Sequence, residues 1–173
     1  MNPQSVYGHS KAAGELAIGK IYPEGSYIVR TAWLYSEFGK NFARTMCNLA
    51  ISSDKDVNVV NDQIGQPTNA NQLAAQLIDL VNSGAGFGVY HATNSGQASW
   101  FEFAQEIFKL SGADVGRVIP VSSGAFPRPA KRPHYSVLSH DSWVNSRISP
   151  MSDWKSALGK SFPAILDSIK MQG

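Results

Sequence analysis

The stretch SYIVRTAW, residues 26–33, has the composition of a buried β-strand, because β-branched and aromatic side chains fill most of it. Before it, residues 5–20 carry apolar side chains at helical spacing. After it, a loop with Gly39 leads to a second helical pattern at 41–51. A strand between two helices is the repeating unit of an α/β fold.

The same alternation continues along the chain. Ser99 is a candidate N-cap, and Glu102 three residues later completes a capping box for a helix that runs to about Leu110. The other expected elements are strands at 57–60, 88–92 and 118–121, a helix at 71–81, and one or two short helices between 151 and 170. The sequence therefore predicts an α/β fold with parallel pairing of at least the first strands.

Charge and composition exclude several classes of protein. The chain has 173 residues, of which 43% are hydrophobic and 16% are charged, a balance typical of a packed globular domain and not of a disordered chain. With 15 Lys and Arg against 13 Asp and Glu, the net charge is +2, and no long run of one sign occurs. We therefore expect one domain of ordinary size that does not bind nucleic acid.

Cysteine content and hydropathy indicate the compartment. Cys47 is the only cysteine, so the sequence offers neither an internal disulfide nor a cysteine pair for a structural zinc site. No apolar stretch approaches the ~20 residues of a membrane helix, and the first residues lack the basic and apolar regions of a signal peptide. We expect a cytoplasmic protein in a reducing compartment, with no membrane partner and no bound metal.

Tyr7 and Lys11 lie four residues apart within the first helical pattern. Residues at this spacing share a helix face, so the phenol and the ammonium group can act on one small volume. A phenol has a pKa of about 10, and a nearby cation favours its phenolate form, which suits proton transfer to a carbonyl that receives a hydride. A surface tyrosine beside a solvated lysine is the alternative that the spacing leaves open.

The glycine cluster at 84–88 does not have the order of a dinucleotide-binding turn. It follows a helix and precedes a strand, whereas a turn that binds pyrophosphate follows a strand and precedes a helix. We therefore interpret the cluster as an ordinary turn. His91, in the strand that follows, is expected to be a core histidine and not a catalytic one.

Residues 2–15, NPQSVYGHSKAAGE, resemble the catalytic-helix segment of the extended short-chain dehydrogenases/reductases, which act mainly on nucleotide sugars. More narrowly, the chain resembles the dTDP-4-dehydrorhamnose reductase family, because later stretches similar to that family follow in its order. These stretches are RTAWLY (30–35), GKNF (39–42), DQIGQPT (62–68), SWFEFA (99–104) and PRPAKRP (127–133). The similarity runs from Asn2 to about Leu138.

The resemblance implies an enzyme that reduces dTDP-4-dehydrorhamnose at C4 to dTDP-L-rhamnose, with hydride from NADPH or NADH. It implies that Tyr7 donates the proton to the developing alkoxide. It also implies that Lys11 holds the nicotinamide ribose and favours the phenolate of Tyr7. The partner implied is the dTDP-sugar substrate.

Four residues are candidates for substrate binding. Trp33 ends the first predicted strand, where open α/β sheets place ligands, although a core aromatic is the alternative. Asn41 can cap the second helix and also contact a diphosphate, and Gln66 is either a nucleotide or sugar contact or a plain turn residue. Arg132 lies in a segment expected to form an extended polyproline-like loop, and its guanidinium suits phosphate oxygens. Its neighbours Arg128 and Lys131 are expected to be solvated.

The resemblance begins in the middle of the family's fold. It implies an α/β chain that is the C-terminal portion of an NAD(P)-binding, Rossmann-like extended short-chain reductase, without the N-terminal dinucleotide-binding half. Residues 1–60 would then complete the Rossmann-like sheet and carry the catalytic helix, and residues 61–173 would be mainly substrate-binding. We expect the isolated chain to be inactive, and to self-associate or depend on the missing half.

Two other functions remain open. One is a non-catalytic binding or regulatory module that resembles the β subunit of methionine adenosyltransferase. The other is a different nucleotide-sugar reductase or epimerase. The presence of Trp33 together with Tyr7 and Lys11 favours the enzyme, and Trp33 together with residues 62–68 favours the dTDP-sugar reductase.

Overall fold

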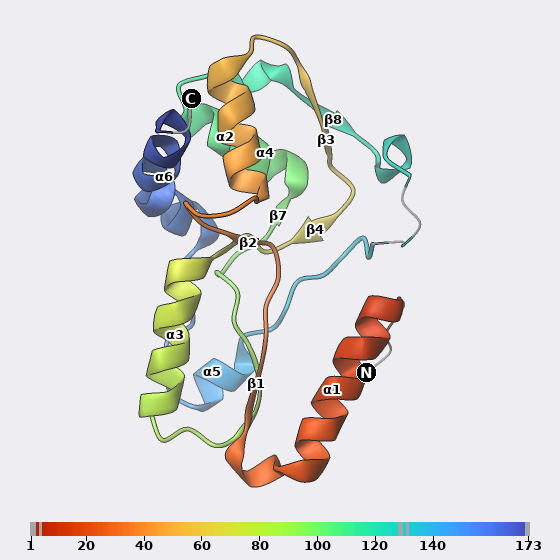
Figure 1. Cartoon of the computed structure of the whole chain (residues 1–173), viewed down its shortest axis with the longest axis vertical. Coiled ribbons are helices and arrows are strands. Elements are labelled where there is room, and N and C mark those ends of the chain that lie inside the picture. The colour runs from red at the N-terminus through yellow and green to blue at the C-terminus, as the bar shows by residue number, and fades with distance from the viewer. Residues whose placement is uncertain (1–2, 4, 128–129, 131, 172–173) are drawn as a thin grey trace.

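The computed structural model describes residues 3, 5–127, 130 and 132–171. Its helices and strands form two groups, one above the other in Figure 1, joined by short strands. The upper group contains α2, α4 and α6 with β3 and β8, and the lower group contains α1, α3 and α5 with β1 and β6. Each group has its own cluster of buried apolar side chains.

The lower group is built on one parallel strand pair. Strand β1 (Tyr27–Arg30) pairs in parallel with β6 (Gly88–His91). The helices of this group are α1 (Val6–Ile21), α3 (Ala70–Asn82) and α5 (Asp141–Asn145). Its core consists of Leu80, Tyr90, Ala92, Trp143 and Met151.

The upper group is built on a second parallel strand pair. Strand β3 (Val57–Val60) pairs in parallel with β8 (Val118–Val121). Its helices are α2 (Phe42–Ser52), α4 (Trp100–Leu110) and α6 (Trp154–Lys170). Helix α4 contacts both α2 and α6, so the core of this group lies around its apolar face.

Two strand pairs of two residues each connect the groups. Strand β2 (Leu34–Tyr35) pairs in parallel with β5 (Thr68–Asn69). Strand β4 (Ile64–Gly65) pairs with β7 (Ala98–Ser99) in the antiparallel direction. The remaining elements are three short 3-10 turns: η1 (Pro23–Gly25), η2 (Val115–Arg117) and η3 (Ser123–Ala125).

Several local sequence signals are confirmed by the structure. Ser99 and Glu102 form the capping box that starts α4, and the strands at 57–60 and 118–121 have the predicted bounds. Parallel pairing of the first strands is confirmed, and the glycine cluster 84–88 is a turn before β6. The C-terminal segment forms one long helix, α6, so the alternative of two short helices there is wrong.

The prediction of a strand over residues 26–33 is wrong at its end. Strand β1 stops at Arg30, whose carbonyl accepts the last pairing hydrogen bond from the amide of Ala92. Trp33 then takes a left-handed backbone conformation, with φ at 48°. This conformation is incompatible with an extended strand and turns the chain toward β2. Trp33 therefore lies in a loop after the strand and not at its last position.

Helix α1 stands apart from both cores in Figure 1. None of its residues, all of which the structure describes, is buried. Its contact with the sheet is an ion pair in which Arg30 on β1 donates to both carboxylate oxygens of Glu15. This contact also holds the pKa of Glu15 below its ordinary value, chiefly through the hydrogen bonds from Arg30. Within the described part of the chain, no helix meets the length and hydropathy needed to cross a membrane.

Candidate functional site

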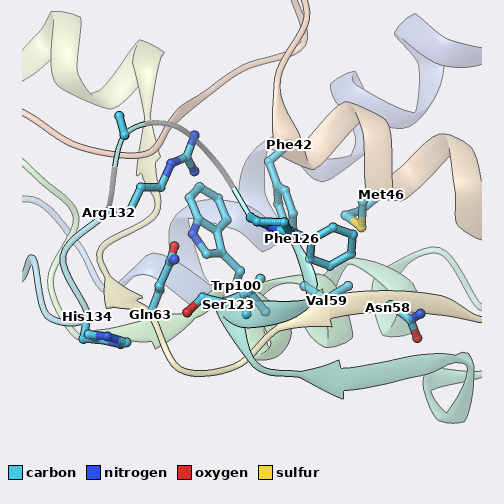
Figure 2. Close-up of a pocket in the computed structure, with 14 residues that line it drawn as sticks. Phe42, Met46, Asn58, Val59, Gln63, Trp100, Ser123, Phe126, Arg132 and His134 are labelled. Atoms are coloured by element: carbon cyan, nitrogen blue, oxygen red, sulfur yellow. The ribbon is translucent and has the colours of Figure 1, made fainter. Parts of the chain in front are cut away.

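A cavity of about 760 Å³ lies between the helices of the upper group and the segment that follows β8. Figure 2 shows Phe42, Trp100 and Phe126 turned toward this cavity, with Met46 beside Phe42. Gln63, Ser123, Arg132 and His134 supply polar groups at its margin. An apolar cavity with a few polar groups at its edge is typical of a site for a small organic ligand.

Two helix starts form the aromatic wall. Phe42 is the first residue of α2 and Trp100 is the first residue of α4, and their ring centroids lie 4.6 Å apart. Trp33 stacks on Trp100 with a centroid distance of 3.6 Å and an interplanar angle of 11°. The local signals that begin these helices, an Asn cap and a capping box, therefore also place the rings.

A carboxylate beside the cavity bonds to the segment that follows β8. Both oxygens of Asp62 accept from the backbone N–H of Ser123, at 2.9 and 3.0 Å, and one of them also accepts from the Ser123 hydroxyl at 2.9 Å. The Ser123 amide is the main reason that the pKa of Asp62 lies below its ordinary value. Nearby, the ring Nδ1 of His134 lies 2.9 Å from the backbone carbonyl oxygen of Asp62.

Trp33 lies behind the aromatic wall and does not line the cavity itself. Its indole packs against Gly65, because a Cβ at that glycine would come within 2.6 Å of Trp33 Cε2. The absence of a side chain at position 65 is thus what allows Trp33 to stack on Trp100. Contact between Trp33 and a ligand stays a prediction.

Asn41 is the N-cap of α2, as predicted. Its Oδ1 accepts from the amide of Arg44 at 3.1 Å, and its Nδ2 donates to the carbonyls of Ser36 and Phe38 at 2.9 and 3.1 Å. The side-chain amide therefore fixes both the helix start and the loop before it. Its contact with a diphosphate stays a prediction.

We expect Asn41→Ala to lower the free energy of unfolding by roughly 1–2 kcal/mol, because the cap and both amide donors are lost. Asn41→Asp is the matched control, since it keeps the capping oxygen and loses only the donors. Urea denaturation followed by circular dichroism measures the difference. Equal stability of the alanine variant and the unmodified chain would contradict this role.

Gln66 is buried and has partners for both polar atoms of its amide. Its Oε1 accepts from the amide of Leu138 at 2.8 Å and from the hydroxyl of Thr93 at 2.9 Å, and its Nε2 donates to the carbonyl of Leu138 at 3.3 Å. In this structure the side chain of Gln66 therefore holds the backbone at Leu138 against the loop that contains Gln66. These contacts support a structural role for Gln66 in its loop. Its contact with a nucleotide or a sugar stays a prediction.

Tyr7 and Lys11 share one face of α1, as their spacing predicts. The Lys11 ammonium lies 5.3 Å from the centroid of the Tyr7 ring. Tyr7 is 72% exposed, and neither residue is among the described residues that line the cavity. Tyr7 and Lys11 are therefore separate from the aromatic cavity in this structure, and their roles in catalysis and in cofactor binding stay predictions.

Arg132 is placed at the cavity, whereas Arg128 and Lys131 lie outside the described residues. His91 has partners in the lower group, since its Nδ1 lies 3.0 Å from the carbonyl oxygen of Ser139. Cys47 is buried, and burial raises the pKa of its thiol. In the described residues, no group of three His, Cys, Asp or Glu side chains could hold a metal ion.

Sequence reasoning missed Phe42, Trp100 and Phe126 as site residues. Phe42 and Trp100 lie in helical patterns and in the GKNF and SWFEFA stretches of the resemblance, and Phe126 begins the segment expected to form an extended polyproline-like loop, but none of the three is a candidate site residue there. A helix start that carries an aromatic residue immediately after its cap was the available signal for the first two. No local signal marks Phe126, which directly follows the short turn η3.

Comparison with known proteins gives concordant matches. The model of the RmlD substrate binding domain family matches residues 1–166. The dTDP-4-dehydrorhamnose reductase of Streptomyces griseus is 46% identical over 167 residues, which cover 94% of this chain and 55% of that protein. A Streptomyces antibioticus protein, named as a probable dTDP-4,6-dihydroxy-2-methyloxan-3-one 4-ketoreductase, is 45% identical over 164 residues, with 95% and 55% covered.

Among solved structures, a Bacillus anthracis dTDP-4-dehydrorhamnose reductase in complex with NADP matches with a TM-score of 0.85. It is 37% identical, and the match covers 94% of this chain and 56% of that one. The predicted α/β fold of a reductase is thereby confirmed, and the chain spans about half the length of the curated relatives it matches. Because the family model extends over nearly all of it, the chain belongs to the RmlD substrate binding domain family.

Proposed function

We propose that the cavity binds the nucleotide part of a dTDP-linked 4-keto-6-deoxy sugar, and that the chain serves the reduction of this sugar to dTDP-L-rhamnose. The observation that carries the proposal is an aromatic wall, Phe42 and Trp100, that shares one cavity with the guanidinium of Arg132. A flat base packs well on aromatic rings, and a guanidinium pairs with phosphate oxygens. The names of the relatives supply the identity of the base and the sugar.

The reaction requires that a hydride reach C4 and that a proton reach the carbonyl oxygen. A reduced nicotinamide supplies the hydride when it is bound, and the NADP complex of the Bacillus anthracis relative supports this choice of cofactor. Tyr7 would donate the proton to the oxygen, and Lys11, on the same face of α1, would hold the ribose and favour the phenolate that remains. Because the chain spans about half the length of its relatives, the reduction itself is part of the proposal.

Isothermal titration calorimetry tests the nucleotide part of the proposal. We expect saturable binding of dTDP and dTDP-rhamnose, and weaker binding of UDP and UDP-sugars. Competition between dTDP and dTDP-rhamnose would indicate that they share one site. Equal affinities for the uridine and thymidine ligands, or no binding of either, would contradict the proposal.

Self-association of the chain is a further expectation. Helix α1 exposes apolar side chains that no part of the described structure covers, among them Val6 at 87% and Ile21 at 81% exposure. Exposed apolar surface of this kind drives association with a second copy or with another protein segment. Multi-angle light scattering of the purified chain should give a mass above 18.7 kDa. A stable monomer over the accessible concentration range would contradict this expectation.

A further inference from the structure

One side of the cavity depends on a segment with little regular structure of its own. Within the described residues between 122 and 134, the regular structure is the single turn η3. Phe126 directly follows that turn and faces the cavity that Phe42 and Trp100 line on the other side (Figure 2). The position of Phe126 must therefore be fixed by contacts from outside the segment.

At the start of the segment, the amide of Asn61 donates to the carbonyl of Val121 at 2.9 Å. The next residue, Asp62, bonds to Ser123 through its side chain. Its carboxylate accepts three hydrogen bonds from the backbone amide and the hydroxyl of Ser123, which begins η3. The amide of Phe126 in turn donates to the carbonyl of Ser123 at 3.1 Å. A continuous chain of hydrogen bonds thus runs from Asp62 through Ser123 to Phe126.

A second set of bonds holds the far end of the segment at the same place. The backbone carbonyl of Asp62 lies 2.9 Å from His134 Nδ1, and the amide of Ile64 donates to the carbonyl of His134 at 2.8 Å. Residues 62–64 therefore hold Ser123 and His134 together, although each is more than 55 positions away in sequence. Of these contacts, the carboxylate bonds to Ser123 are the ones that a change of the Asp62 side chain removes.

We propose that Asp62 is a positioning residue of this cavity: its carboxylate fixes the Ser123 turn and thereby sets the place of Phe126 opposite Phe42 and Trp100. Asp62 acts through Ser123 and touches no ligand itself. The part of this inference that concerns affinity for dTDP rests on the proposed function. The part that concerns the turn does not.

The experiment compares Asp62→Asn with Asp79→Asn, a matched control on the exposed face of α3. The asparagine at 62 keeps the size of the side chain, but its amide nitrogen replaces one accepting oxygen and meets the donors of Ser123. Hydrogen exchange of the backbone amides from Ser123 to Phe126 reports on the turn without any ligand. Calorimetry with dTDP reports on the cavity.

We expect Asp62→Asn to speed exchange at Ser123 by about tenfold or more, because hydrogen bonds to a charged acceptor are among the stronger ones. We expect the Kd for dTDP to rise by roughly 2- to 10-fold as the aromatic face of Phe126 is displaced. Exchange in α4 and α6 should stay unchanged, whereas a general loss of stability would raise it there as well. Asp79→Asn should leave all three readouts unchanged.

Results that differ from these expectations would overturn either the proposal for Asp62 or the proposed function. Unchanged exchange at Ser123 in Asp62→Asn would overturn the proposal, and so would faster exchange with an unchanged Kd. If the unmodified chain binds no dTDP, the proposed function fails, and exchange from Ser123 to Phe126 alone then decides whether Asp62 positions the turn.

A second variant covers the case in which Asp62→Asn does not fold. Ser123→Ala removes only the hydroxyl bond and leaves the amide bonds to the carboxylate. It should speed exchange at the turn by a smaller factor, about threefold. Where Asp62→Asn folds, the double variant should match Asp62→Asn alone, because both changes act on one contact. Full additivity, or no effect of Ser123→Ala, would overturn the proposal.

Discussion

Replacing Trp100 with alanine should weaken the binding of dTDP to the cavity by roughly ten- to hundredfold. The ring of Trp100 stacks on Trp33 at a centroid distance of 3.6 Å and lies 4.6 Å from the tilted ring of Phe42. A ring that is fixed in this way offers its surface to a base at little cost in side-chain entropy. Its removal takes away a stacking surface and leaves Trp33 without its partner.

Trp100→Phe is the matched control, because it keeps a smaller aromatic ring at the start of α4. We expect it to retain most of the affinity, and calorimetry with dTDP measures both variants. Near-ultraviolet circular dichroism separates loss of binding from loss of packing. An alanine variant that is folded and binds dTDP as tightly as the unmodified chain would remove Trp100 from the site.

The helix starts could be predicted from sequence because their signals are local. Asn41 caps α2 and Ser99 caps α4 through bonds to amides three residues later. Such a bond depends on nothing outside one turn of chain, so the residue types and their spacing suffice. For the same reason Tyr7 and Lys11 could be placed on one helix face.

The end of β1 could not be predicted, because its cause lies far along the chain. Residues 31–33 have the composition of a strand, yet Trp33 leaves the extended conformation and packs on Gly65 and Trp100. Tertiary packing here overrides the β propensity of the segment. A glycine in a two-residue strand and an aromatic residue at a helix start carry no local sign that they lie together.

The cavity is the least predictable part for the same reason. Its lining comes from α2, β3, α4 and the segment after β8, which lie far apart in the sequence. The bonds that hold the start of the last segment join Ser123 to Asp62, 61 positions away. Arg132 was a candidate because guanidinium chemistry is visible in one residue. Phe126 was not, because an aromatic residue in an extended loop becomes a wall only after the loop is fixed.

The upper core should respond more strongly to substitution than any exposed position. Phe103 on α4 is 1% exposed, and its ring lies 5.4 Å from Tyr35, 5.4 Å from Phe42 and 5.9 Å from Trp154. Phe103→Ala should lower the free energy of unfolding by about 3–5 kcal/mol. The substitution removes a buried ring and leaves an empty space among the three rings that surround it. Urea denaturation measures this loss.

Phe38→Ala is the control for that measurement, because Phe38 is 72% exposed and the substitution should change the free energy of unfolding by less than about 0.5 kcal/mol.

Phe103→Ala also tests how the core supports the site. Phe103 does not line the cavity but packs against Phe42, which does. Under conditions where the variant is still folded, we therefore expect weaker binding of dTDP as Phe42 loses its support. A large loss of stability with unchanged affinity would mean that Phe42 is held by Trp100 and its own helix alone.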